Sequence, residues 1–323
     1  MSLFSNSQKM TGAGRRCNKS MNFFKGAVYL SLAASIWGMT YVVSKVVLDS
    51  ISPWLLLEMR FLLAFITLGI ICIYQKAWKI NKKDLIPVAI IGLVGYSGSI
   101  GLQFIGTKLS GAAMGSLITS ASPALISFFA FFILKEKITN RKIISLVLAT
   151  IGVIVVIGIP KGNTDYGAYY GNIILFGAAI TWALYTVLSK AQTKKYSSLT
   201  VTTWATVFGV IFTIPFTVFE QIQNPTSLSF HFWIWMGVLF LGTISTAGAF
   251  YLWNKGFEFI DTSTGSLFFF LQPLIGTIFG FFLLNETIKT SFYVGSLLIV
   301  LAVYLSIKEP KKISTMHYSS KKV

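Results

Sequence analysis

The sequence has little charge for its length. Only 11% of its 323 residues are charged, whereas 54% are hydrophobic. A soluble globular domain carries about 25% charged residues, so this little charge does not cover a water-exposed surface. The solvent for most of the surface is therefore predicted to be lipid, and the chain is predicted to be an all-α membrane protein.

Residues that carry chemistry are also scarce. The two cysteines, Cys17 and Cys72, lie in a polar segment and in an apolar run, so they indicate neither a disulfide framework nor a metal site. The sequence contains no phosphate-binding G-x-x-x-x-G-K-[ST] motif and no metal-binding H-E-x-x-H motif. We therefore predict no cofactor and no bound metal, and we expect that the protein is not an enzyme.

Long apolar runs are abundant instead. A helix needs about 20 apolar residues to cross a bilayer, and ten runs of about this length follow one another with short connections. They are 25–47, 54–73, 85–105, 110–133, 141–159, 171–190, 198–219, 231–253, 262–283 and 290–307. The sequence therefore predicts ten transmembrane helices packed in one bundle.

Lysine and arginine are distributed unevenly between the connections. If the N-terminus is cytoplasmic, 22 of the 27 lie in cytoplasmic segments, four lie outside, and Arg60 lies within a span. Cytoplasmic connections of membrane proteins carry such an excess. We therefore expect an integral, multi-pass plasma membrane protein with both termini cytoplasmic. The same short basic clusters argue against nucleic acid as a partner.

The two halves of the sequence resemble each other. "IWGMTYVVSK" at 36–45 matches "ITWALYTVLSK" at 180–190, with Trp37 on Trp182, and further along Pro123 falls on Pro273. Each half holds five spans, and because five is odd, the second half crosses the membrane in the opposite sense. This predicts two inverted five-helix repeats, an architecture that many secondary transporters use. They cover 23–160 and 168–307, between a disordered cytoplasmic tail over 1–22 and a basic cytoplasmic tail over 308–323.

Several segments together resemble a known family. They are "SIWGMTYVVSK" at 35–45, Ser52-Pro53, Arg60-Phe61, "ASPALISFFAFFILKEKIT" at 121–139 and, more weakly, "LQPLIGTIFGFFLLNETIK" at 271–289. Over residues 23–307 the chain resembles the ten-helix EamA-type carriers of the drug/metabolite transporter superfamily. The resemblance implies a carrier of small molecules, commonly an exporter of amino acids or related metabolites, but it is not specific to a substrate.

Two prolines deep in the fourth and ninth spans are candidates for the solute pathway. Pro123 and Pro273 each remove a helix hydrogen bond, and the freed carbonyl in a membrane needs protein or cavity water. Side chains at helical spacing form a hydroxyl-rich stripe in the fourth span and a partly aromatic stripe in the ninth. The first is Ser116, Thr119, Ser120, Pro123 and Ser127, and the second is Ser266, Phe269, Phe270, Pro273 and Thr277. Either these stripes line a central cavity or their small residues simply allow close helix packing.

The first and sixth spans contribute aromatic candidates. Trp37 and Tyr41 share one face of the first span, and Trp182 lies at the matching place with Tyr185 near the same face. Aromatic residues near span ends anchor helices at the interface, but Trp37 lies mid-span. A role in the pathway or in packing therefore fits Trp37 better.

Glu58 and Arg60 place two charges inside the second span. An intramembrane charge is a candidate functional group, and the alternative is an outer-interface pair in headgroup water. At this spacing the two side chains do not face each other. Arg60 has no counterpart in the second half, where Ala205 occupies its place. Arg60 is the candidate for binding a carboxylate-bearing solute, and Glu58 is the candidate coupling residue.

These features favour a secondary transporter that exports small amphipathic metabolites such as amino acids by alternating access around a midplane cavity. The partners are then a small-molecule solute and the lipid bilayer, and a homo-oligomer is compatible with the sequence. A non-transporting membrane scaffold or accessory subunit remains an alternative. An intramembrane enzyme is a weaker one, because no histidine lies inside a span beyond the first residue of 231–253.

Overall fold

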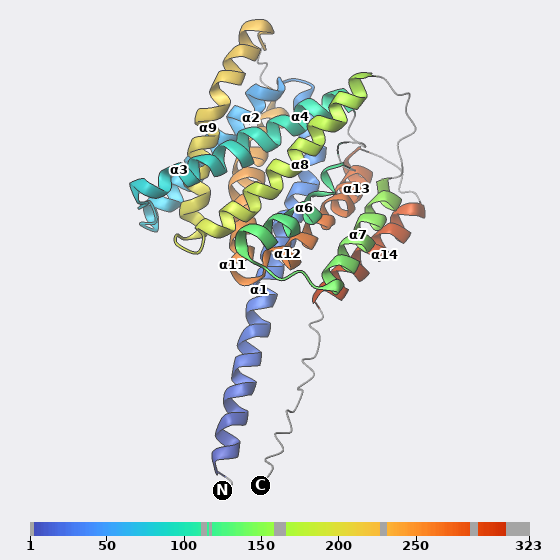
Figure 1. Ribbon diagram of the computed structural model, residues 1–323. Helices are drawn as coiled ribbons and strands as arrows, with labels where there is room; N and C mark the ends of the chain where they lie inside the picture. The colour runs from blue at the N-terminus through green and yellow to red at the C-terminus, as the bar shows by residue number, and fades with distance from the viewer. Residues whose placement is uncertain are drawn as a thin grey trace.

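The computed structural model describes the backbone of residues 3–110, 115, 118–157, 166–226, 231–284 and 290–307, and their side chains except those of 3–20, 41, 156–157, 166–168, 284 and 307. Every regular element in these ranges is helical (Figure 1). In the first half they are α1 (Leu3–Leu48), α2 (Pro53–Tyr74), α3 (Lys82–Ile91), η1 (Gly92–Gly98), α4 (Ser99–Ser110), α6 (Ser122–Phe129), η2 (Ala130–Leu134) and α7 (Asn140–Ile157). In the second half they are α8 (Tyr166–Gln192), α9 (Ser198–Gln223), α10 (Phe232–Leu239), η3 (Phe240–Gly248), α11 (Ala249–Phe259), α12 (Thr262–Gly265), η4 (Ser266–Phe270), α13 (Leu271–Leu284) and α14 (Thr290–Ile307).

Long apolar helices dominate the described part of the chain. Seven of them are long and apolar enough to cross a membrane: Met21–Leu48, Pro53–Tyr74, Lys82–Ser110, Tyr169–Gln192, Ser198–Gln223, Phe232–Phe259 and Thr262–Leu283. Two shorter apolar helices cover Ser122–Leu134 and Thr290–Ser306. These helices coincide with eight of the ten predicted spans, and Ser122–Leu134 overlaps only the second half of the predicted span 110–133. The predicted span 141–159 overlaps α7, which begins with the charged residues Arg141 and Lys142.

The N-terminal segment differs from its prediction. The backbone is helical from Leu3, as the first part of α1, where the sequence predicts a disordered tail over 1–22. The first proline of the chain is Pro53, so no residue before it lacks the N–H that a helix needs. The predicted boundary at 160–168 falls mostly outside the described residues, and the predicted tail 308–323 lies wholly outside them.

Two of the spans contain π-helical segments at corresponding places. The segment η1 ends at Gly98 and η3 ends at Gly248, and these glycines match at the same offset of 150 that aligns Gly106 with Gly256. A π-helix is a rare departure from the α-helix that is frequent at functional sites. Both halves therefore carry the same irregularity in their third span.

Both predicted proline sites interrupt their helices. Residues 120–121 form a turn, and α6 begins just after it with Pro123 in its first turn. In the second half the 3₁₀ segment η4 precedes α13, in which Pro273 is the third residue. Proline is tolerated in a first turn because its missing N–H has no partner there. The irregular turns therefore precede the prolines, and the helices restart at them.

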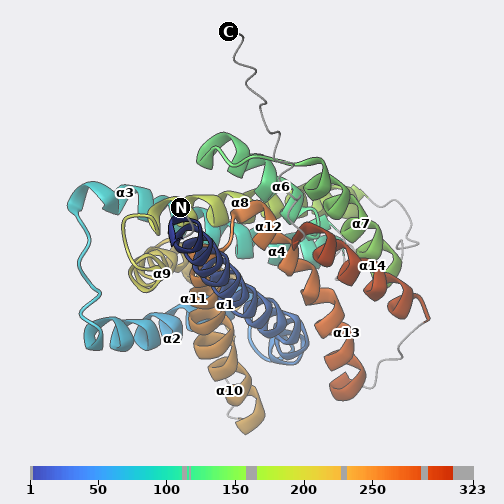
Figure 2. The same ribbon diagram turned by 90° about the horizontal axis from the view of Figure 1, so that it is seen from below.

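Helices from the two halves pack against each other in matched pairs. Helix α1 lies between α11 and α13 (Figure 2), whereas α8 contacts α4 and α6. Helix α2 pairs with α9, and α7 lies beside α14. The largest core cluster joins Trp37 of α1, Phe61 of α2, Tyr185 of α8 and Trp253 of α11. The two halves therefore share one core.

Gly95 of η1 allows one of these contacts between the halves. A Cβ atom at this position would overlap ring atoms of Tyr185 on α8, and Tyr185 is fully buried. We predict that Gly95→Ala lowers the free energy of unfolding by about 1–3 kcal/mol, because overpacking a rigid core displaces its neighbours. Thermal unfolding of the purified protein in detergent measures this effect.

Gly69→Ala on α2 is the matched control. Its added Cβ meets only Phe65 and Trp78 at an ordinary 3.9 Å, and alanine has the higher helix propensity. Gly69→Ala should therefore leave the melting temperature unchanged or raise it. Equal melting temperatures for the two variants would contradict the close packing of η1 against α8.

Candidate solute site

Arg60 is buried between α2 and η3. Only 4% of its surface is exposed. Its Nε donates to the hydroxyl of Thr246 at 3.3 Å, and its Nη2 donates to the hydroxyl of Ser245 at 3.5 Å. No ion pair joins Arg60 to an acidic side chain in the part of the chain that the structure describes. Among the described residues, its charge is therefore held by hydroxyl groups without a neutralising carboxylate.

Ser245 connects this charge to α1. Its hydroxyl accepts a hydrogen bond from Thr40 at 2.7 Å, and its backbone carbonyl accepts one from the indole N–H of Trp37 at 3.1 Å. Thr246 in turn donates to the carbonyl of Leu241, five residues earlier in η3. One polar cluster, made of Trp37, Thr40, Arg60, Ser245 and Thr246, thus joins α1, α2 and η3.

Glu58 faces a different part of the core. Trp54 and Phe61 lie four residues before it and three after it, and therefore share its face of α2. Trp54 packs on Phe216 of α9, and Phe61 packs on Tyr96 of η1. Glu58 is 7% exposed, and its Oε2 has no hydrogen-bond partner among the described residues. The two charges therefore lie on separate faces of α2, as predicted from their spacing.

The matched tryptophans of the two halves meet at the centre. The rings of Trp37 and Trp182 pack edge to face with centroids 5.1 Å apart. Phe250 and Trp253 of α11 contact both rings, and so does Phe269 of η4. We call these five residues the aromatic cluster. It adjoins the polar cluster because Trp37 belongs to both.

A second buried polar network lies on the α8 side. Asn254 of α11 donates to the hydroxyl of Tyr185 at 3.2 Å and to the hydroxyl of Thr202 at 2.9 Å. Tyr185 also packs against Tyr96, whose hydroxyl has no hydrogen-bond partner among the described residues. The indole N–H of Trp182 is likewise without such a partner. Buried polar atoms without partners are rare in native proteins, so these atoms mark the centre as a candidate binding region.

The structure places Phe270 away from the aromatic cluster. Its ring lies in a separate core with Ala149 and Val153 of α7 and Ile299 of α14. Phe269 occupies the central position instead. The segment η4 is a 3₁₀ helix, in which neighbouring side chains are separated by a third of a turn. Of the two predicted stripe residues, Phe269 therefore packs in the aromatic cluster and Phe270 lies outside it.

The polar stripe before Pro123 is described only in part. Thr119 is buried and its hydroxyl donates to the carbonyl of Gly115 at 2.7 Å. Ser116 lies outside the described residues, as does the side chain of Tyr41. Pro123 is buried and its carbonyl accepts from Ser266 at 3.4 Å, whereas the carbonyl of Pro273 accepts from Thr277.

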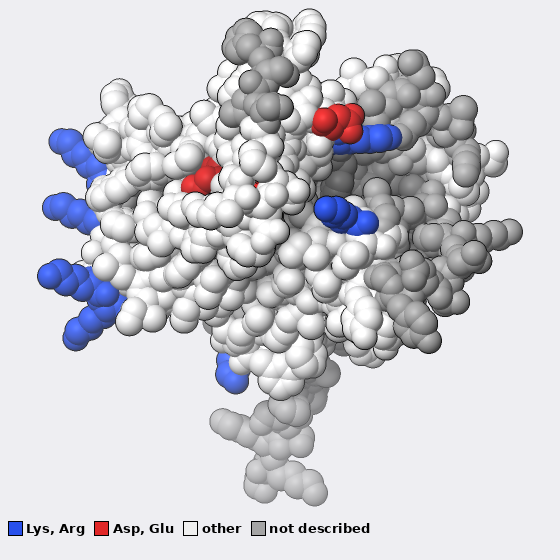
Figure 3. Space-filling model, turned by 90° about the horizontal axis from the view of Figure 1, so that it is seen from above, with Lys and Arg blue, Asp and Glu red and all other residues white. Residues whose placement is uncertain are grey.

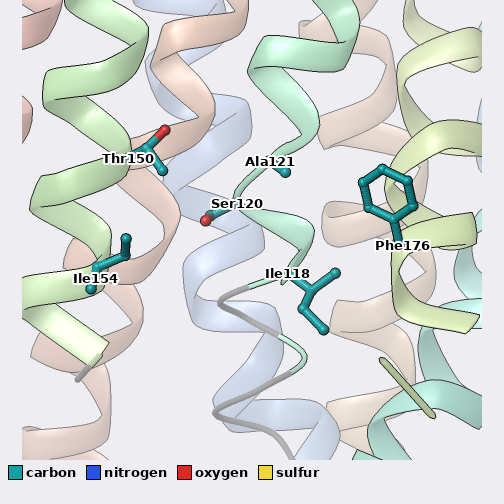
Figure 4. A pocket seen from close by; sticks show the side chains of 6 residues that line it. All are labelled: Ile118, Ser120, Ala121, Thr150, Ile154 and Phe176. Atoms are coloured by element: carbon teal, nitrogen blue, oxygen red, sulfur yellow. The ribbon is translucent and has the colours of Figure 1, made fainter. Parts of the chain in front are cut away.

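Ser120 lines a pocket of about 330 Å³ between α7 and α8. Figure 4 shows Thr150 and Ile154 on one side of it and Phe176 on the other, with Ile118, Ser120 and Ala121 between them. No residue of the polar cluster or of the aromatic cluster lines this pocket. Ser120 therefore belongs to a lateral pocket, distinct from the region around Arg60.

Sequence reasoning missed several residues of the site. Ser245 and Thr246 are hydroxyl residues in an apolar span, and Thr40 lies on the same helix as Trp37. Such residues commonly allow close helix packing. Their residue types alone therefore do not distinguish a site residue from a packing residue. Phe250, Trp253 and Asn254 could have been found from the aromatic residues at i, i+3 and the amide inside the same span. The described residues contain no group of three or more His, Cys, Asp or Glu side chains that could hold a metal ion.

Comparison with known proteins identifies the chain's relatives. It is 28% identical to the uncharacterized transporter YetK of Bacillus subtilis over 295 residues, 88% of each chain. It is 30% identical to the uncharacterized transporter YyaM of the same organism over 271 residues, 82% of this chain and 88% of the relative. An uncharacterized transporter of Archaeoglobus fulgidus is 25% identical over 87% of this chain and 97% of its own.

A solved structure titled "Crystal structure of protein" has the same fold. It superposes with a TM-score of 0.74 at 19% identity, over 87% of this chain and 96% of its own. The profile of the EamA-like transporter family matches two segments, residues 24–158 and 169–308. This match covers most of the chain, and the same residues contain the long apolar helices. The chain therefore belongs to the EamA-like transporter family, as an integral, multi-pass membrane protein.

Proposed function

We propose that the protein is a secondary transporter that exports small amphipathic metabolites, such as amino acids, by alternating access around a central site. The observation that carries the proposal is Arg60. Its guanidinium is buried, bonded only to hydroxyl groups among the described residues, and adjacent to an aromatic cluster built from both halves. A carboxylate suits the guanidinium, and an apolar body suits the rings.

We also propose that the fold consists of ten spans in two inverted repeats. The two segments that match the family, 24–158 and 169–308, support this division. The exchange of partners supports it as well, because α1 packs on α11 as α8 packs on α4. Trp37 and Trp182, which correspond in the repeat, meet at the centre. Inverted repeats of this kind give two interchangeable states around one site.

The proposed orientation places the lower side of Figure 1 in the cytoplasm. The α2–α3, α6–α7, α8–α9 and α11–α12 connections lie on that side, together with the end of α14. They hold most of the described lysines and arginines, including Lys76, Lys79, Lys82 and Lys83 before and within α3. Seen from above, basic side chains gather at the edge beside α3, and other basic and acidic side chains are scattered over the described part of that face (Figure 3). The positive-inside rule then makes the lower side cytoplasmic.

Cysteine labelling tests this orientation. In a background without Cys17 and Cys72, we expect Ser50→Cys and Lys194→Cys to react with an impermeant maleimide from opposite sides of the membrane, since both positions are exposed in connections of opposite sides. Intact cells and inverted vesicles provide the two sides. Labelling of both cysteines from the same side would contradict the proposed topology.

Transport assays test the role of Arg60. We predict that Arg60→Lys folds and inserts but transports carboxylate-bearing solutes at least about tenfold less efficiently, because lysine keeps the charge and loses the planar fork of donors. Uptake of radiolabelled neutral amino acids and of their deaminated carboxylates into proteoliposomes measures this.

Arg141→Lys is the control, since Arg141 is exposed at the start of α7. It should transport at the wild-type rate. Wild-type transport by a well-expressed Arg60→Lys protein would exclude Arg60 from solute binding. Absence of flux with the wild-type protein for every solute would favour the membrane-scaffold alternative.

Glu58 is the proposed coupling residue. Its carboxyl is buried in α2 and one oxygen has no described partner. We expect Glu58→Gln to lose the acceleration of transport by a pH gradient while still exchanging solute, because glutamine cannot bind and release a proton. The measurement is flux with and without the gradient. Asp49→Asn, at an exposed turn, should keep the full response, and the same response in Glu58→Gln would exclude Glu58 as the proton site.

A further inference from the structure

The turn between α11 and α12 is hydrogen-bonded to a carboxylate from the other half of the chain. Glu136, in the α6–α7 connection, accepts hydrogen bonds from the backbone N–H groups of Thr262 and Ser263 at 2.8 and 3.0 Å. It also accepts one from the hydroxyl of Ser263 at 3.0 Å. Hydrogen bonds to an ionised carboxylate are stronger than bonds between neutral groups. Glu136 therefore holds the beginning of α12 across 126 residues of sequence.

The backbone before Glu136 is shaped for this contact. Lys135 adopts a left-handed conformation, with φ of 58°, where η2 ends. Such a conformation is uncommon for a residue other than glycine. The chain reverses there, and the N–H of Glu136 returns to the carbonyl of Ala130 at 3.2 Å. The turn thus fixes Glu136 in front of α12.

Further contacts surround the same turn. Asp261 caps α12 by accepting from the N–H of Thr264 at 3.0 Å, and Lys142 of α7 pairs with the same carboxylate. Burial raises the pKa of Asp261, but the hydrogen bond and charge of Lys142 and the two hydrogen bonds from Thr264 together outweigh burial, so the pKa lies below its ordinary value. Lys190 of α8 donates to the carbonyl of Ile260 at 3.5 Å. The turn is therefore held by charged groups from α7, from α8 and from the α6–α7 connection.

The start of α12, which Glu136 holds, is followed directly by a segment that reaches the candidate solute site. The helix type changes twice between Thr262 and Leu271, from α through the 3₁₀ segment η4 and back to α. Changes of this kind mark hinges. Phe269 lies in η4 and packs against Trp37 and Trp182. A movement of the start of α12 would therefore move a ring of the aromatic cluster.

We propose that Glu136 is a gating residue, whose carboxylate holds the start of α12 while the lower face is closed and releases it when that face opens. The inference rests on the proposed function, because only a transporter must open one face at a time. By contrast, α2 and α9 are bonded near both ends, by Glu220 to Ser52 and by Thr200 to the carbonyl of Ala77. That pair is suited to move as one body.

Glu220 supplies a matched control. Its carboxylate also accepts from two backbone N–H groups, those of Trp54 and Leu55, and from one serine hydroxyl, that of Ser52. It caps the N-terminus of α2, which is a single unbroken helix. A carboxylate that only stabilises a helix end should behave alike at both places. A gate should respond only at Glu136.

A single cysteine at Ser266 reports the opening of the lower face. Ser266 is fully buried just beyond the turn that Glu136 holds. It is introduced into a background without Cys17 and Cys72. The rate of its modification by an impermeant maleimide is measured in membrane vesicles of both orientations. We expect Glu136→Gln to raise this rate at least about tenfold from the lower face only, because the amide lacks the negative charge that strengthens all three hydrogen bonds and also lacks one acceptor oxygen. Glu220→Gln should leave it unchanged.

Ser263→Ala provides a milder second variant. It removes one donor to Glu136 and keeps both backbone bonds, so the rate should rise less than in Glu136→Gln. Equal rates in the starting protein and in both Glu136→Gln and Ser263→Ala would overturn the proposal, and so would an equal rise with Glu220→Gln. If Glu136→Gln does not fold, Ser263→Ala decides alone. Solute flux of the wild-type protein is measured separately. If the labelling rates contradict the gate but the wild-type protein transports solute, the proposed function still holds.

Discussion

The structure depends on one constraint: the hydrocarbon of a bilayer offers no hydrogen bonds, so each buried polar group needs a partner from the protein. A charge at full depth costs about 2.5–3.5 kcal/mol on insertion scales. Arg60 meets this constraint through two hydroxyl groups of η3 rather than through a carboxylate. Because Ser245 also receives hydrogen bonds from Thr40 and Trp37, the charge, α1 and α2 are joined at one residue of a π-helical segment.

The repeat distributes this chemistry unequally. In the alignment of the halves, Thr40 corresponds to Tyr185 and Ser245 corresponds to Gly95. Thr40 and Ser245 form a hydrogen bond between hydroxyls, whereas the ring of Tyr185 packs directly on Gly95. Arg60 corresponds to Ala205, so the charge exists on one side only. The same scaffold therefore presents a polar wall and an aromatic wall on the two sides of the paired tryptophans.

Periodicity and charge counts located most spans, because membrane helices need a continuous apolar length and basic connections. They also selected Trp37, Trp182 and Arg60, which are central in the structure. They grouped Phe269 and Phe270 on one stripe, whereas the structure places Phe269 in the aromatic cluster and Phe270 in a separate core, within a 3₁₀ segment that the α-helical pattern did not predict. They missed Ser245 for a related reason. Its partners lie 185 to 208 residues away in sequence, so its role depends on how the halves pack.

The two capping carboxylates illustrate how function separates from local geometry. Glu136 and Glu220 satisfy equivalent sets of donors, and each favours a helix N-terminus through its charge. What differs is the helix beyond the cap. Helix α2 continues unbroken for 22 residues. Losing hydrogen bonds at its N-cap therefore disturbs only its first turn. Helix α12 lasts four residues before the helix type changes, and the segment after it carries Phe269 into the aromatic cluster. The same interaction is therefore structural in one place and suited to gating in the other.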